Sequence, residues 1–187
     1  MGDNFITQLK ERDERAFKEL VEQYQQMVFS TCLGIVHSTD DADDLTQEVF
    51  IEAFNSIDQF REDAKISTWL YRIAINKSLN YIRDNKRKRL LQSIGVLNIP
   101  DVPDDQHNFD LPYEALLEKQ RSDMIHAAID ALPKNQRTAF VLSKYEDLSY
   151  KEIAEVMEIS VSSVESLLFR ARKSLQKKLL RCYRKEC

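Results

Sequence analysis

The sequence predicts an all-α protein with two small helical domains joined by a flexible acidic linker. Apolar residues recur at steps of three and four along most of the 187 residues, as they do on the buried face of an α-helix. The chain has only 3 glycines and 4 prolines, and one glycine and three prolines lie within residues 90–112. That segment contains no basic residue, and it separates two stretches of helical periodicity. The predicted boundaries are a first domain at 1–89, a linker at 90–112 and a second domain at 113–187.

The first domain is expected to contain three long helices. Apolar residues from Phe17 to Ile35 repeat at helical spacing after Asp13, which predicts a helix over about 14–37. Ser38 and the two residues after it can cap a second helix over about 41–55. A third helix is expected from about residue 65 to about residue 87.

The second domain is expected to contain a helix-turn-helix. Helical segments are predicted at about 113–131, 135–145, 150–157 and 161–182. Ser149 and Glu152 form a capping box at the start of the third of these segments, and Ser160 is placed to cap the fourth. The turn between them is three or four residues long, as in a helix-turn-helix, and Glu158 within it is expected to be strained because glycine would be easier there. A plain helical hairpin is the structural alternative.

The last helix sorts its residues into two faces. Its expected core stripe comprises Val161, Val164, Leu168, Ala171, Leu175 and Leu179. The opposite face could enter a major groove. Eight basic residues lie between 170 and 185, and they favour phosphate contacts and hence DNA binding over a plain hairpin.

Charge is distributed in four blocks of alternating sign, although the formal net charge is only −4. Residues 1–70 carry 6 basic and 15 acidic groups, residues 71–89 carry 7 and 1, residues 90–118 carry 0 and 6, and residues 119–187 carry 14 and 9. An acidic surface favours a basic protein partner, whereas the cluster at 83–89 is typical of a surface that faces phosphates. Solvated faces are the simpler interpretation of any single block.

Several classes of protein are excluded. No apolar stretch approaches the roughly 20 residues of a membrane span, and the first four residues lack a signal-peptide pattern, so a cytoplasmic protein is expected. The few glycines cannot form either nucleotide-binding loop. The 3 cysteines lack C-x-x-C spacing, and the 3 histidines stand apart, so we expect no disulfide framework, no metal, no cofactor and no catalytic residue. Cys32 is expected to be a small core residue.

Acidic residues align along the predicted second helix. Asp41, Asp44, Glu48 and Glu52 fall within one narrow stripe beside the apolar residues, which is typical of a docking face, with a solvated face as the alternative. Residues 40–44 also satisfy D-D-x-x-D, the carboxylate spacing with which isoprenoid synthases bind magnesium diphosphate. No second aspartate motif accompanies it, so a diphosphate enzyme is the least favoured of the functions considered.

The predicted third helix has an exposed side of cations and amides. Its members are Arg72, Asn76, Asn80, Arg83 and Arg87. Amides can read base edges, and cations can hold phosphates. Three aromatic residues, Phe60, Trp69 and Tyr71, lie before and at the start of this helix. Core packing is one interpretation of these rings, and stacking on unpaired bases is the other.

With these motifs, the sequence resembles bacterial sigma factors of the extracytoplasmic-function group, compact members of the sigma-70 family that retain only regions two and four. The resemblance covers about residues 13–89 and 113–182, and it is carried by Asp43–Phe50, by Phe60–Arg61 with Thr68–Ala74, and by Leu148–Ala154 with Phe169–Arg172. It implies a factor without enzymatic activity that gives core RNA polymerase its promoter specificity. The two domains would be regions two and four. A stand-alone helix-turn-helix activator is the alternative.

The resemblance also implies partners and contact residues. Region two would dock on the β′ clamp helices of core RNA polymerase through Asp44, Gln47 and Glu48, and the acidic stripe adds Asp41 and Glu52 to this candidate surface. It would capture the melted minus-ten element through Phe60, Asn76 and Asn80, and the neighbouring aromatic and basic residues complete the candidate surface: Arg61, Trp69, Arg72, Arg83 and Arg87. Region four would meet the β flap and read the minus-thirty-five duplex through Ser162, Ser163, Glu165, Ser166, Phe169, Arg170 and Lys173. Glu165 and Leu167 depart from the family, in which basic residues are common there. An anti-sigma protein is an implied partner.

Overall fold

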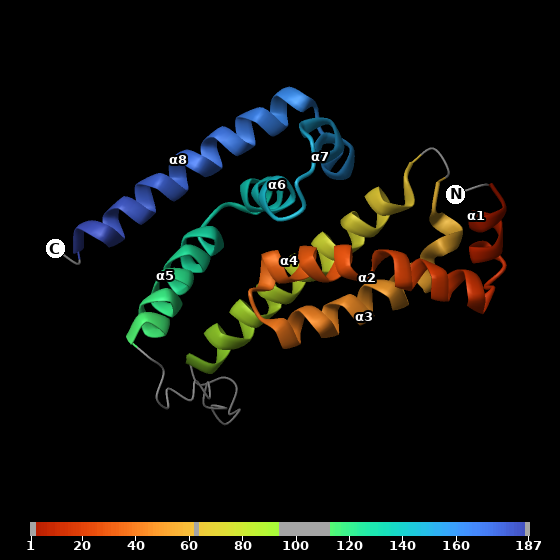
Figure 1. Ribbon diagram of the computed structural model, residues 1–187, viewed down its shortest axis with the longest axis horizontal. Helices are drawn as coiled ribbons and strands as arrows, with labels where there is room; N and C mark the ends of the chain where they lie inside the picture. Colours follow the sequence, from red (N-terminus) through yellow and green to blue (C-terminus); the bar gives the residue numbers. More distant parts are fainter. Residues whose placement is uncertain (1–2, 62–63, 94–112, 186–187) are drawn as a thin grey trace.

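The computed structural model describes residues 3–61, 64–93 and 113–185, and all regular elements within these ranges are helical (Figure 1). The helices are α1 (Asp3–Lys10), α2 (Glu14–Val36), α3 (Thr39–Ser56), the short 3-10 helix η1 (Ile57–Gln59), α4 (Ile66–Ser93), α5 (Tyr113–Asp130), α6 (Lys134–Lys144), α7 (Tyr150–Met157) and α8 (Val161–Lys185). The predicted all-α class is confirmed. None of the described helices is long and apolar enough to cross a membrane.

Helices α1 to α4 form the N-terminal unit. The Asp13 side chain accepts hydrogen bonds from the backbone N–H groups of Arg15 and Ala16 at 2.8 and 3.0 Å, which begins α2 at the predicted place. Ser38 begins α3 in the same way by accepting from Asp41 N–H. Cys32 is fully buried in the core of this unit, as expected. The sequence patterns did not predict α1, which is held by the burial of Leu9, or η1.

Helices α5 to α8 form the C-terminal unit and contain the predicted helix-turn-helix. The capping box of Ser149 and Glu152 is present at the start of α7, and Ser160 accepts a hydrogen bond from Ser163 N–H at the start of α8. Glu158 between the two helices has a left-handed backbone with φ of 54°, as predicted. The expected core stripe is confirmed from Val164 onward.

One member of that stripe is exposed. Val161 was expected in the core, but it is the first residue of α8 and its side chain is 38% exposed. The buried stripe therefore begins one turn later, and its fully or nearly fully buried members are Val164, Leu168, Ala171 and Leu175. Leu179 is partly buried against the same cluster.

The two units pack directly against each other. One cluster of buried apolar residues joins Ile35 and Tyr71 of the N-terminal unit to Val141 and Ile153 of the C-terminal unit. In Figure 1 the C-terminal unit lies along one side of α2 and α4. Helix α4 continues to Ser93, so the first residues of the predicted linker at 90–112 are helical, and residues 94–112 lie outside the described ranges.

Candidate polymerase and nucleic-acid interfaces

The acidic stripe of α3 forms one face of the N-terminal unit, but two of its carboxylates are bound to α4. Asp44, Gln47 and Glu52 are exposed. Asp41 is only half-exposed and accepts a hydrogen bond of 2.5 Å from the Tyr81 hydroxyl. Glu48 pairs with Lys77, whose Nζ lies 3.2 Å from the carboxylate. The stripe is therefore partly anchored to α4.

The metal interpretation of the aspartates in α3 gains no support from the geometry. Within the described residues, no group of three or more histidine, cysteine, aspartate or glutamate side chains is arranged to hold a metal ion. The carboxylate of Asp41, a member of the D-D-x-x-D motif, instead accepts the hydrogen bond from α4.

Two apolar side chains of α3 lie beside the acidic stripe, and the sequence patterns did not single them out. Ile51 is 61% exposed and Phe54 is 41% exposed. The Phe54 ring meets Phe17 edge-on at 4.7 Å, and the Arg12 guanidinium lies 4.8 Å from its centre. These residues were detectable in principle because they fall outside the core periodicity of α3. Exposed apolar groups next to carboxylates are typical of a surface that binds protein.

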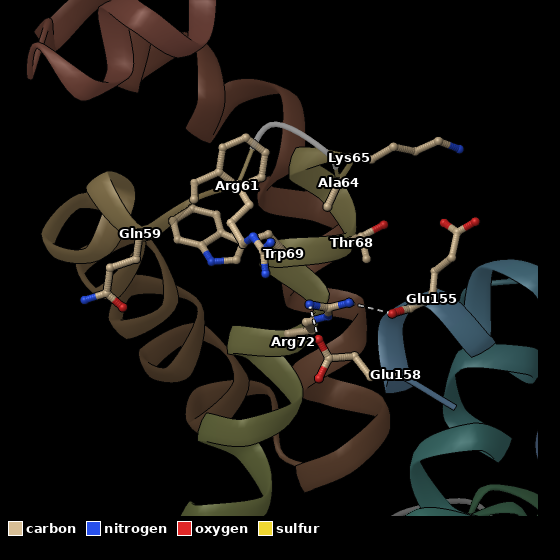
Figure 2. A pocket seen from close by; sticks show the side chains of 10 residues that line it. Gln59, Arg61, Ala64, Lys65, Thr68, Trp69, Arg72, Glu155 and Glu158 are labelled. Atoms are coloured by element: carbon tan, nitrogen blue, oxygen red, sulfur yellow. Dashed lines mark hydrogen bonds and ion pairs between the residues drawn. The ribbon is translucent and has the colours of Figure 1, made fainter. Parts of the chain in front are cut away.

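A cavity of about 640 Å³ lies between the start of α4 and the end of α7 (Figure 2). Phe60, Arg61 and Trp69 line it from the N-terminal unit, and Glu155 and Glu158 line it from the C-terminal unit. The Phe60 ring is buried and lies 5.3 Å from the ring of Trp69, which is half-buried. Core packing is therefore confirmed for Phe60 and in part for Trp69, and stacking on unpaired bases stays a prediction for the side of the rings that borders the cavity.

Along α4, the predicted stripe of cations and amides is largely exposed. Asn76, Asn80 and Arg87 are exposed, and the exposed Arg83 pairs with Asp84 at 3.0 Å. These side chains occupy one side of the helix, as the spacing predicted.

Arg72, the first cation of this stripe, contacts the C-terminal unit. Its Nε donates to the Val156 carbonyl at 3.1 Å, and its Nη2 donates to the Glu155 carbonyl at 2.7 Å. Its Nη1 lies 2.8 Å from the Glu158 carboxylate. The sequence patterns did not predict these contacts, because they join residues more than eighty positions apart.

The outer face of α8 is open to solvent. All seven predicted contact residues of this helix are exposed, and Phe169 is 67% exposed although it is a large aromatic residue. The guanidinium of Arg170 donates from Nε to the Ser166 carbonyl at 3.1 Å, which fixes the base of the side chain along the helix. Ser163 takes part in the cap with Ser160. This face can present two cations, one acid and one aromatic ring to a groove.

Tyr71, the third aromatic residue of the group noted in the sequence, is buried between the two units. Its hydroxyl donates to the Glu146 carboxylate at 3.1 Å. Burial raises the pKa of Glu146 to about 7, against hydrogen bonds from Tyr71 and Thr31 that lower it. Burial also raises the pKa of Tyr71. Of the two interpretations of this ring, core packing is the one confirmed.

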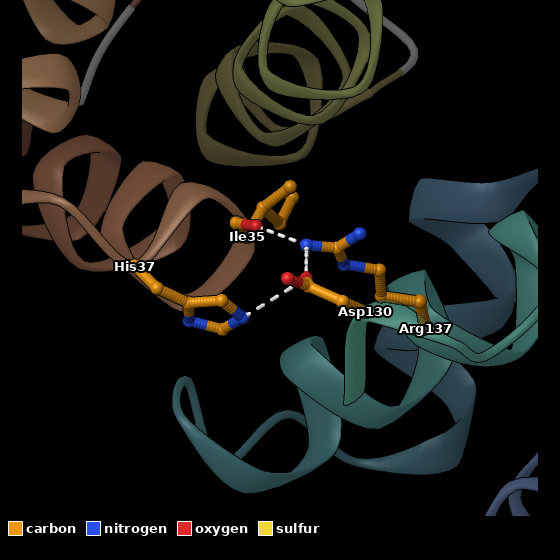
Figure 3. Close-up of polar contacts among 4 residues, drawn as sticks. All are labelled: Ile35, His37, Asp130 and Arg137. Carbon is orange, nitrogen blue, oxygen red and sulfur yellow. Dashed lines mark hydrogen bonds and ion pairs between the residues drawn. The ribbon is translucent and has the colours of Figure 1, made fainter. Parts of the chain in front are cut away.

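A second polar network crosses between the units (Figure 3). The buried guanidinium of Arg137 donates both to the Ile35 carbonyl of α2 and to the Asp130 carboxylate. His37 lies 3.4 Å from the same carboxylate and stacks on His126, with ring centres 4.2 Å apart. Burial and the neighbouring His37 lower the pKa of His126. Although burial alone would raise the pKa of Asp130, its contacts with His37 and Arg137 lower that pKa.

Family models match both units of the chain. Residues 20–88 match the model described as sigma-70 region 2, and residues 122–175 match the model described as sigma-70 region 4. The RNA polymerase sigma-H factor of Pseudomonas aeruginosa is 35% identical over 176 residues, which cover 93% of this chain and 91% of that protein. The ECF RNA polymerase sigma factor SigW of Bacillus subtilis is 34% identical over 176 residues, which cover 93% and 94%.

Two solved structures share the fold. CnrH, in complex with the cytosolic domain of CnrY, matches with a TM-score of 0.66 and 24% identity, over 94% of each chain. The sigma factor RpoE of Bartonella quintana, in complex with the anti-sigma factor NepR, matches with a TM-score of 0.58 and 24% identity, over 87% of this chain and 96% of that chain.

Proposed function

This chain belongs to the extracytoplasmic-function group of the sigma-70 family, and from that premise we propose how its residues divide the work of promoter recognition. The chain is a promoter-directing sigma factor of RNA polymerase. The observation that carries this function is the match to region two and region four, in that order, in one chain. A stand-alone helix-turn-helix activator is not favoured, because it would leave the region-two match without a role.

The acidic face of α3 is proposed to dock on the β′ clamp helices of core RNA polymerase. The exposed carboxylates of Asp44 and Glu52 and the exposed side chains of Ile51 and Phe54 support this assignment. Apolar groups supply buried area at a protein interface, and aligned charges steer the encounter with a basic partner. Asp41 and Glu48 would act in part by holding α3 against α4.

The start of α4 is proposed to capture the unpaired minus-ten strand. The cavity beside Phe60 and Trp69 is bordered by Arg61 and Arg72, and the exposed amides of Asn76 and Asn80 continue along the helix. Aromatic surfaces next to cations suit unpaired bases, because every base has a face that can stack and a phosphate that cations attract. Arg83 and Arg87 would extend the phosphate contacts.

The outer face of α8 is proposed to read the minus-thirty-five duplex while other surfaces of region four meet the β flap. Arg170 is the cation on this face nearest the start of the helix, and a bidentate arginine–guanine pair contributes about 1–3 kcal/mol of base discrimination. Glu165 can accept a hydrogen bond from cytosine and repels phosphates, and Phe169 can contact a thymine methyl group.

An anti-sigma protein is a proposed partner, because both similar structures are complexes and the RpoE complex is formed with an anti-sigma factor. The proposed site of action is the cytoplasm, where RNA polymerase works. The chain is proposed to perform no covalent step, so promoter opening would rest on strand capture alone.

Transcription by reconstituted holoenzyme tests the proposed function. Core RNA polymerase with this chain should yield run-off transcripts from a subset of genomic fragments, and core enzyme alone should not. A promoter library randomised at the minus-thirty-five element should then show altered base preference for Arg170→Ala and Glu165→Arg. Unchanged preferences in both variants would remove α8 as the reader, and a lack of specific transcripts with wild-type chain would reject the function.

A further inference from the structure

Each helical unit places one arginine on the C-terminal end of a helix in the other unit. Arg72 of α4 donates to the carbonyls of Glu155 and Val156 in the last turn of α7. Arg137 of α6 donates to the carbonyl of Ile35 in the last turn of α2, as Figure 3 shows. The two units are therefore joined by a reciprocal pair of arginine caps.

Such caps are favourable because the last carbonyls of a helix have no partner within the helix and carry the negative end of its dipole. The two caps differ in exposure. The side chain of Arg137 is 4% exposed and also binds Asp130, so its cap is a buried part of the interface between the two units. The ion pair of Arg72 with Glu158 has exposed fractions of 33% and 72%, so it contributes little free energy and water or another anion can reach it.

The exposed cap employs a cation that unpaired DNA would also need. Arg72 borders the same cavity as Phe60 and Trp69, and Glu155 and Glu158 close that cavity on the opposite side (Figure 2). An incoming strand would bring phosphates to the cation that the α7 carbonyls and the Glu158 carboxylate already contact. A phosphate and a carboxylate compete for a guanidinium because both accept paired hydrogen bonds from it.

We propose that Arg72 changes partners: in the closed protein it caps α7, and at a promoter it binds the backbone of the unpaired minus-ten strand. Closure of the two units and capture of the strand then exclude each other. This inference rests on the proposed function of α4. In this proposal, Glu158 and the end of α7 compete with DNA phosphates for Arg72.

The matched pair Glu158→Gln and Glu155→Gln tests this exchange in the full chain. Each variant removes one carboxylate from the same cavity. Only Glu158→Gln removes an ion pair with Arg72, because Glu155 contacts Arg72 through its backbone carbonyl, which glutamine retains. If the acidic groups acted only by repelling DNA, the two variants would have the same affinity for single-stranded DNA.

Two measurements follow. The first is the affinity for a pool of short single-stranded DNA oligonucleotides of random sequence, by fluorescence anisotropy. The second is the distance between spin labels at Asn55 of α3 and Gln176 of α8, both exposed, with Cys182 and Cys187 replaced by serine and the buried Cys32 retained. We expect Glu158→Gln to bind the pool about two- to fivefold more tightly than Glu155→Gln, the range that an exposed ion pair supports. We also expect the pool to lengthen the label distance in the wild-type chain.

Equal affinities for the two variants would overturn the proposal, as would an unchanged label distance when the wild-type chain is saturated with DNA. Failure of Glu158→Gln to bind the pool at all would also overturn it. Run-off transcription by the unlabelled wild-type holoenzyme separates these results from the proposed function. Specific transcription together with a negative result above rejects the partner exchange alone.

Discussion

A substitution at Gly34 offers a direct way to weaken the interface between the two units without removing a polar contact. A Cβ atom at this position of α2 would lie 3.0 Å from Val141 Cγ1 and 3.4 Å from Tyr145 Cγ. Tyr145 is 45% exposed and can move aside, but Val141 is 1% exposed and cannot. Overpacking of a well-filled contact costs about 1–3 kcal/mol, and it would apply only to the closed arrangement.

Helix propensity acts in the opposite direction but on a different equilibrium. Replacing a glycine inside a helix by alanine stabilises that helix by about 1 kcal/mol, and in Gly34→Ala this gain is shared by the closed and open arrangements. The variant should therefore keep or increase the stability of the N-terminal unit while closure weakens by about 1–3 kcal/mol. That loss shifts the closed-to-open ratio by about 5- to 150-fold.

The label pair at Asn55 and Gln176 measures this shift. Gly34→Ala should broaden the distance distribution and move it to longer values, whereas Gln25→Ala, an exposed change on the same helix, should leave it unchanged. Thermal unfolding of both variants checks that α2 stays folded. A closed distribution in Gly34→Ala identical to that of the wild-type chain would refute the argument that Val141 cannot yield.

Three further outcomes are expected. Asp44→Lys should abolish retention of core RNA polymerase in a pull-down, and intact retention would contradict the docking assignment. Because the side chain is exposed, the free energy of unfolding should change by about 0.5 kcal/mol or less. Asn76→Ala should impair transcription from duplex promoters more than from templates with a premelted bubble, and equal losses would place Asn76 outside strand capture. Because burial raises the pKa of Glu146 to about 7, closure should be favoured with Glu146 protonated and should weaken as pH rises through about 7. Glu146→Gln should remove this dependence of the label distance on pH, and an unaltered pH profile would show that another group is responsible.

Local signals explain why most of the fold could be predicted. Asp13, Ser149 and Ser160 each cap a helix by bonding to backbone groups two or three residues ahead, so a short stretch of sequence contains the whole interaction. Helix α1 was missed for the opposite reason. It is short, and its position depends on burial of Phe5 and Leu9 in the core of the N-terminal unit, which no local pattern reveals.

The same distinction applies to the candidate sites. The exposed face of α8 was predictable because its buried stripe fixes which side chains point away from the core. Periodicity could not show that Asp41 would bind Tyr81, that Glu48 would bind Lys77, or that Tyr71 would reach Glu146, 75 positions away. Helical spacing identifies a shared face, but it does not identify the neighbour that covers part of that face.

Glu158 stands at a left-handed turn position that glycine would favour, and its contact with the distant Arg72 explains why a glutamate is useful there. Its left-handed backbone, with φ of 54°, would be less strained in glycine, and a helix of eight residues gains little by tolerating strain at its end. Glycine would lack the carboxylate that lies 2.8 Å from Arg72. The left-handed residue also ends α7 where the carbonyls of Glu155 and Val156 reach the same guanidinium. The strained residue is therefore part of the contacts that Arg72 makes at the end of α7. We expect Glu158→Gly to stabilise the turn and, at the same time, to weaken closure of the two units. Relief of backbone strain alone would predict only the first of these effects.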